Sequence, residues 1–242
     1  RKLYSDGGQL CRLDLRSGKR NVLLDDPKGG IRDPQVHYDG QTILFSYRKG
    51  DQPYYHLYEI QADGTGLRQL TNGPYDDFEP TYLPNGEIVF CSSRCRRWVP
   101  CWSTQVAVLY RCDADGQNIR KVSSNIEQEN TPCVLPDGRL LYTRWEYLDR
   151  SQVDYHHLWT VNPDGTGQMV YFGNQYPGTV MIDAQPIPGT RKVVASFSPG
   201  HGRTEHMGAI TVVDPRAGPD AGPFARRISS GADFRDPYPL AE

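Results

Sequence analysis

The chain has 242 residues, with 27 basic and 29 acidic side chains and a formal net charge of -2. A charge so balanced, with no basic run, excludes the usual type of nucleic-acid-binding protein, and no apolar run approaches the roughly 20 residues of a membrane span. The 24 Gly, 19 Pro and 15 Tyr residues favour many short strands joined by turns over helices.

The first 32 residues predict short strands. Three apolar runs at residues 2–4, 9–15 and 21–24 are broken by Asp-Gly-Gly and Ser-Gly turns. The chain begins at Arg1 inside such a pattern, and no signal peptide is recognisable. We therefore expect the sequence to be a piece of a longer chain.

From residue 34 onward, one motif recurs. Each copy has a proline, then a turn and a short apolar strand, most often followed by Ser or Thr and an arginine; the copies begin at Pro34, Pro80, Pro132 and Pro186, and Pro237 begins one more that the end of the sequence cuts off. The spacings are 46, 52, 54 and 51 residues. A period near 50 residues with strand-like units predicts a β-propeller.

Each unit is expected to contain an inner strand, a connecting loop, a second strand, a turn and a third strand. These strands are expected at residues 42–46, 56–60, 87–90, 107–112, 120–123, 139–143, 157–161, 168–172, 192–197, 209–213 and 226–229. Asp-Gly pairs at the turns predict two-residue hairpins. The stretch from Asp113 to Gly116 also begins like a calcium-binding loop, but the later acidic ligands are missing.

One blade cannot bury both faces of its own sheet, so neighbouring blades must stack. The sequence thus predicts an all-β fold: a single β-propeller domain, 1–242, of four-stranded blades. The blade units are 1–33 (partial), 34–79, 80–131, 132–185, 186–236 and 237–242 (partial). These make about five blades of material, which either close into a five-bladed ring or form part of a ring of six or more.

The loops between inner and second strands are long, at residues 47–55, 92–105, 144–156 and 198–208. Because the blades repeat, we expect all four loops on one face, and loops on a rigid scaffold often carry function. They hold or border the candidate metal- or cofactor-proximal residues Cys91, Cys95, Cys101, His156, His157, His201 and His206, and also Trp98, Trp102 and Trp145. No catalytic residue is identified.

Three readings stay open for the cysteines. Cys95 and Cys101 form a disulfide that pins the loop, remain free thiols, or join Cys91 and the histidines at a zinc or haem-contacting site. If residues 156–161 form a strand, the rings of His156 and His157 point to opposite faces and cannot easily serve one site.

A basic and aromatic patch follows the second inner strand, comprising Arg94, Arg96, Arg97 and Trp98. It could bind an anionic group, since arginine matches carboxylates. The alternative is ion pairing with acidic residues of the same blade (Asp76, Asp77 and Glu79) or of the next (Asp149 and Asp154). An arginine recurs after each inner strand, as Arg48, Arg94 and Arg144, which favours the architectural role.

Two resemblances rest on these motifs. The repeat over residues 34–237 resembles the TolB-like, WD40-like propeller repeats of periplasmic proteins. More narrowly, segments 88–94, 99–102 and 106–116 resemble the middle propeller domain of the hydrazine synthase alpha subunit family of planctomycete-type bacteria. That resemblance implies an extracytoplasmic multihaem enzyme in which the propeller lies between an N-terminal domain and a haem-bearing C-terminal domain. The haem attachment motif CxxCH is absent here, so we expect no covalently bound haem.

The first functional hypothesis is therefore a non-catalytic scaffold of an extracytoplasmic haem-containing oxidoreductase. Its partners would be other domains or subunits, any zinc or haem contact would be shared with them, and Arg94, Arg96, Arg97, Trp98, Trp102 and Trp145 would form the interaction face. The alternative is a TolB-like periplasmic propeller that binds protein or carbohydrate. A third hypothesis is a propeller that gates access to a hydrolase domain.

Overall fold

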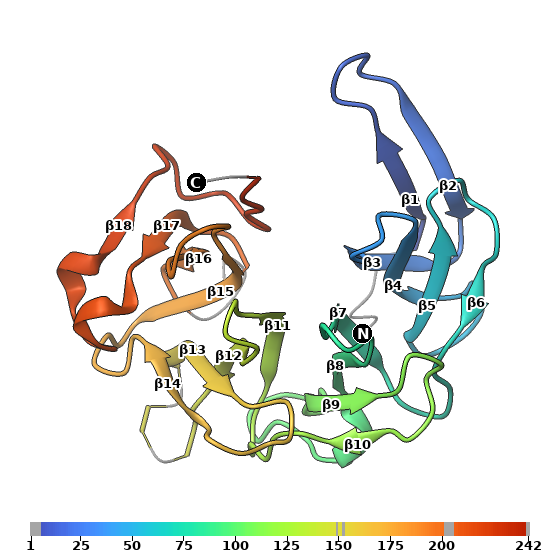
Figure 1. Cartoon of the computed structure of the whole chain (residues 1–242). Coiled ribbons are helices and arrows are strands. Elements are labelled where there is room, and N and C mark those ends of the chain that lie inside the picture. The colour runs from blue at the N-terminus through green and yellow to red at the C-terminus, as the bar shows by residue number, and fades with distance from the viewer. Residues whose placement is uncertain (1–5, 149, 152, 201–205, 241–242) are drawn as a thin grey trace. The chain divides into compact units, whose positions relative to one another are not determined.

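The computed structural model describes residues 6–148, 150–151, 153–200 and 206–240 (Figure 1). They form β-strands and three short 3-10 helices, η1 (Ser93–Cys95), η2 (Pro215–Ala217) and η3 (Gly222–Phe224). The chain divides into two compact units: unit 1 comprises residues 1–94 and 110–120, and unit 2 comprises residues 95–109 and 121–242. Among the described residues, no helix is long and apolar enough to cross a membrane.

Four groups of four antiparallel strands follow one another along the chain (Figure 1). Blade 1 consists of β3 (Gly30–Val36), β4 (Thr42–Arg48), β5 (His56–Gln61) and β6 (Arg68–Gln69). Blade 2 consists of β7 (Asp77–Tyr82), β8 (Ile88–Ser92), β9 (Val108–Cys112) and β10 (Arg120–Lys121). Blade 3 consists of β11 (Glu129–Val134), β12 (Leu140–Trp145), β13 (Tyr155–Val161) and β14 (Met169–Phe172). Blade 4 consists of β15 (Thr179–Pro186), β16 (Val193–Ser198), β17 (Ala209–Val213) and β18 (Ala225–Arg227).

These groups confirm the predicted four-stranded blades. A separate hairpin of β1 (Gly8–Leu13) and β2 (Arg20–Asp26) precedes blade 1. Blades 3 and 4 are continuous as one sheet, because β13 and β15 pair in parallel over two residues each.

The first strand of each blade is not among the strands that the sequence predicts. β3, β7 and β11 contain the recurring proline, and proline normally argues against a strand inside a sheet. It is tolerated here because it lies at a β-bulge, where the register shifts between Arg32 and Gln35 in blade 1, for example. In blade 4 the bulge falls between Ile182 and Gln185, so Pro186 is not the equivalent residue.

A non-glycine residue with positive φ marks each bulge. The φ angles are 55° at Asp33, 52° at Glu79, 49° at Thr131 and 57° at Asp183, and Asp236 near the chain end has 50°. Side chains other than glycine rarely adopt this conformation. Its return at intervals near 50 residues shows that the bulge is part of the blade design.

Apolar side chains are buried between neighbouring sheets. In unit 1, one cluster joins Leu10 of the β1–β2 hairpin to Phe45 and Ile60 of blade 1. In unit 2, a second cluster joins Leu141 and Phe172 of blade 3 to Met181, Ala195 and Val213 of blade 4. This confirms the expectation that blades bury their faces by stacking.

The Asp-Gly pairs form the predicted hairpin turns, with φ of 90° at Gly64, 83° at Gly116 and 89° at Gly165. The Asp113–Gly116 stretch is also a turn, in which the N–H of Gly116 donates to the carbonyl of Asp113 at 2.9 Å. A Cβ on Gly116 would lie 2.1 Å from the carbonyl oxygen of Leu70. The glycine thus provides both the backbone conformation and the close approach of this turn to blade 1.

Candidate functional site

The recurring arginines form ion pairs with acidic residues. Arg94 Nη2 lies 2.7 Å from the fully buried Asp77, and Arg144 Nη1 lies 3.3 Å from the fully buried Glu129. Both carboxylates open the first strand of the same blade. Arg48 pairs instead with Asp6, at 2.6 Å. Arg94 therefore makes the ion pair within its own blade that the architectural interpretation expects, with Asp77 as the partner.

In the structure, Cys95 and Cys101 are free thiols, which corresponds to one of the three alternatives that the sequence leaves open. Cys95 Sγ donates to the carbonyl of Val106 at 3.1 Å, while Cys101 is exposed. Cys91 is fully buried in β8, with its Sγ 3.6 Å from Glu79 Oε2. The three cysteines therefore have separate local environments.

The two adjacent histidines serve different contacts, as the strand pattern predicts. In β13, the His156 ring stacks on Trp145, with centroids 4.8 Å apart and planes at 18°. His157 Nε2 lies 2.8 Å from the carbonyl oxygen of Tyr176, and burial lowers the pKa of His157 to about 4. Both rings are core elements of blade 3.

The remaining candidates do not gather into a metal site. His206 is exposed, and His201 lies outside the described residues. In the part of the chain that the structure describes, no three His, Cys, Asp or Glu side chains are grouped so that they could hold a metal ion. The predicted candidates among the described residues therefore form no such group.

The long loop of unit 2 presents two tryptophans. Residues 97–106, here called the Trp98 loop, form a small hairpin in which Trp98 pairs with Gln105 as an isolated bridge. Val99 and Val106 anchor its base in the core, whereas Trp98 and Trp102 are 61% and 57% exposed. Large exposed aromatic side chains on an anchored loop are typical of an interaction surface.

A short segment, residues 125–128, fastens the Trp98 loop to blade 3. Gln128 accepts a hydrogen bond from the N–H of Ala107 at 2.8 Å and donates to the carbonyl of Gln105 at 2.9 Å. Asn125 Nδ2 donates to the carbonyl of Trp145 at 2.8 Å, and Arg97 donates to the carbonyl of Asn125. The buried Trp145 therefore helps to support the loop. Of the predicted patch residues, Arg96 is exposed and Arg97 is half-buried.

The same segment holds Glu127, which sequence reasoning missed because no motif surrounds it. Its side chain is fully buried, and neither carboxylate oxygen has a hydrogen-bond partner. Burial raises the pKa of Glu127 to about 7, and the charge of Arg97 opposes that shift. A hydrogen bond to Cys101 raises the pKa of Tyr147, and the Glu127 carboxylate adds to this effect. An ionisable group thus lies beneath the exposed loop.

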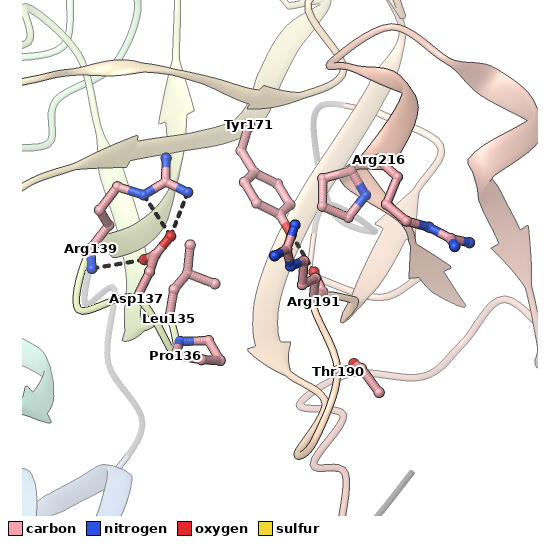
Figure 2. Close-up of a pocket in the computed structure, with 9 residues that line it drawn as sticks. Leu135, Pro136, Asp137, Arg139, Tyr171, Thr190, Arg191 and Arg216 are labelled. Carbon is pink, nitrogen blue, oxygen red and sulfur yellow. Dashed lines mark hydrogen bonds and ion pairs between the residues drawn. The ribbon is translucent and has the colours of Figure 1, made fainter.

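A cavity of about 550 Å³ lies elsewhere in unit 2 (Figure 2). It is lined by the turn that joins β11 to β12, by Tyr171 of β14, and by blade 4 residues that include Arg191 and Arg216. This β11–β12 turn lies at the opposite end of blade 3 from the β12–β13 loop, because strands β11 to β13 are antiparallel neighbours. The described residues of the long loops, on which the predicted site residues lie, do not line this cavity.

Comparison with known proteins gives structural matches alone. No protein-family model and no curated protein matches the chain. Hydrazine synthase of Kuenenia stuttgartiensis matches with a TM-score of 0.83 and 18% identity, over 98% of this chain and 38% of that chain. TolB of Acinetobacter baumannii matches with a TM-score of 0.65 and 14% identity, over 93% of this chain and 49% of that chain. A puromycin-hydrolyzing peptidase of Mycobacterium tuberculosis matches with a TM-score of 0.56 and 12% identity, over 88% of this chain and 31% of that chain.

The chain therefore spans less than half the length of these three proteins. At such low sequence identity, the matches show a shared fold, and the activities of these proteins are not transferred to this chain. Together with the four-stranded antiparallel blades and their period, they show that this chain is a β-propeller related in fold to hydrazine synthase and to TolB-like propellers.

Proposed function

We propose that this chain is a non-catalytic interaction propeller of an extracytoplasmic, haem-containing oxidoreductase. In this proposal, the Trp98 loop contacts another domain or subunit, which carries the haem. The chain contributes a rigid, stacked scaffold and no catalytic group.

The observation that carries the proposal is the match to hydrazine synthase, which extends over 98% of the chain at a TM-score of 0.83. The similarity in fold therefore extends over nearly the whole chain. Because the chain covers 38% of that hydrazine synthase chain, a role alongside further domains is a natural expectation.

The Trp98 loop supports the choice of contact surface. Its two exposed tryptophans would lose a large apolar area from water on docking, and tryptophan is enriched among the residues that dominate binding energy. Gln128 donates a hydrogen bond to the carbonyl of Gln105 and accepts one from the N–H of Ala107, which holds the loop in place, so little ordering would be needed when a partner binds.

The second candidate is a TolB-like periplasmic binding propeller. The match to TolB over 93% of the chain, at a TM-score of 0.65, supports it. In that case, the same loop would dock a protein without haem.

The test places the photo-cross-linking amino acid benzoylphenylalanine at position 98 of the protein in its native host. Tyr38, which is 66% exposed, is replaced in the same way as the matched control. After irradiation, cross-linked peptides are identified by mass spectrometry, and haem is detected by its absorbance in the cross-linked product.

We expect position 98 to cross-link to a haem-bearing polypeptide segment and position 38 not to do so. Cross-linking of position 98 to a protein without haem would replace the proposal with the TolB-like alternative. No cross-link at position 98, or equal cross-linking at both positions, would show that the Trp98 loop is not a docking surface.

A further inference from the structure

The cavity in unit 2 combines an aromatic wall with arginines. Leu135 and Pro136 line one side and the Tyr171 ring lines another, with Arg139 and Arg191 flanking that ring (Figure 2). Tyr171 is held in place, since its hydroxyl donates to the carbonyl of Arg191 at 3.2 Å. The cavity thus has fixed apolar walls and positive charge at its rim.

The three lining arginines differ in how their charges are balanced. Arg139 donates from Nε and Nη2 to Asp137 at 3.0 Å and 2.8 Å. Arg216 is paired with Asp214 at 2.6 Å, and its guanidinium points away from Tyr171 (Figure 2). Arg191 is exposed and has no carboxylate partner among the described residues, so the cavity carries one positive charge that is not neutralised.

The equivalent cavity in unit 1 shows that this charge is not required by the blade design. It has a volume of about 370 Å³ and is lined by the corresponding turns of blades 1 and 2. There Glu59 pairs with Arg68 at 2.6 Å, and Asp39 lies 3.0 Å from His37. Arg68, the arginine of this cavity, thus has a carboxylate partner, in contrast to Arg191 of the unit 2 cavity.

We propose that the unit 2 cavity binds a small organic carboxylate. The carboxylate would accept hydrogen bonds from the guanidinium of Arg191, because the planar donor fork of arginine matches two carboxylate oxygens. A flat apolar part of the ligand would lie against Pro136 and the Tyr171 ring. The volume of about 550 Å³ lies within the range of small-molecule sites.

The probe is benzoate, which has a planar carboxylate on a flat ring, and benzamide is its neutral isostere. Binding to the purified chain is measured by saturation-transfer NMR and by isothermal titration. The Arg191→Gln variant removes the proposed partner. Arg235→Gln, at an exposed arginine outside the cavity, is the charge-matched control, and melting temperatures verify that both variants fold.

We expect benzoate to bind at least tenfold more tightly than benzamide, and Arg191→Gln to weaken benzoate binding by about tenfold while Arg235→Gln leaves it unchanged. Equal binding of benzoate and benzamide would overturn the proposal, as would equal affinities of the two variants. Failure of benzoate to bind at millimolar concentration would overturn it too. Displacement of benzoate by equimolar inorganic phosphate would show a general anion site instead of a carboxylate site.

Discussion

The backbone N–H of Glu79 donates a hydrogen bond to Asp33 Oδ2 at 3.1 Å, across 46 residues of sequence. Both residues are bulge residues with positive φ, Asp33 in blade 1 and Glu79 in blade 2. Unit 2 repeats the relationship, because the N–H of Asp183 donates to Thr131 Oγ1 at 3.2 Å and the N–H of Asp236 donates to Asp183 Oδ2 at 3.4 Å. The unusual bulge conformation therefore lets one blade accept a hydrogen bond from the next.

Replacing Asp33 tests this link between blades. Asp33 Oδ2 also accepts from Ser46 Oγ at 3.0 Å and from Arg32 Nε at 2.8 Å, so Asp33→Ala removes several partners at once. We expect Asp33→Ala to lower the free energy of unfolding by about 2–3 kcal/mol, since hydrogen bonds to charged groups are the strong ones. Asp33→Asn keeps a side-chain oxygen and should cost about half as much. Urea denaturation measures both, and equal losses for the two variants would contradict the hydrogen-bond account.

Alanine substitutions at Gly116 and Gly86 distinguish the cost of a strained backbone from the cost of a steric clash. Their φ angles are nearly the same, 83° and 86°, but a Cβ on Gly86 would meet nothing within 4 Å, whereas one on Gly116 would collide with the Leu70 carbonyl. We expect Gly86→Ala to destabilise by about 1–2 kcal/mol, from the left-handed conformation alone. Gly116→Ala should cost at least about 2 kcal/mol more, because the turn must move away from blade 1. Equal melting temperatures for the two variants would refute the close approach.

The sequence predicts the blades well because their central strands are nearly continuous apolar runs between turns. Ala209–Val213 is predicted with the observed bounds, and 42–46 falls two residues short of the observed end of β4. The first strand of each blade is not predicted from the sequence, because its proline and acidic residues resemble a turn. The bulge becomes evident only from the pairing with the next strand. The burial of Glu127 and the unit 2 cavity are not predicted for a related reason, because both are formed by segments that lie far apart in the sequence.

Thiol labelling of the native protein tests whether Cys95 and Cys101 are free thiols. We expect Cys101 to react first because it is exposed, and Cys95 more slowly because it is half-buried and bonded to the Val106 carbonyl. Cys133 should react only after unfolding, since burial raises its pKa to about 12 and the thiolate is the reactive form. Mass spectrometry of labelled peptides gives the order. If Cys101 labels only after reduction, the disulfide with Cys95 exists after all.

Two buried groups in unit 2 make stability depend on pH in opposite directions. His157 has a pKa of about 4 when folded and about 6.5 when unfolded, so the unfolded state binds more protons in that window and stability rises with pH there. Glu127 has a pKa of about 7 when folded and about 4.5 when unfolded. For Glu127, the folded state binds more protons, so stability falls as pH rises from 4.5 to 7. Between pH 4.5 and 6.5 the two effects largely offset each other.

Replacing Glu127 should therefore remove the contribution to the pH dependence of stability that opposes that of His157. Glu127→Gln keeps the shape of the neutral acid and cannot ionise, so it removes the cost of burying a charge without a partner. We expect the variant to match the natural protein at pH 4.5 and to exceed its free energy of unfolding by up to about 3 kcal/mol at pH 8, at about 1.4 kcal/mol for each pKa unit. Urea denaturation at both pH values measures the difference. A gain that is the same at pH 4.5 and at pH 8 would mean that Glu127 has the same pKa in the folded protein as in the unfolded chain.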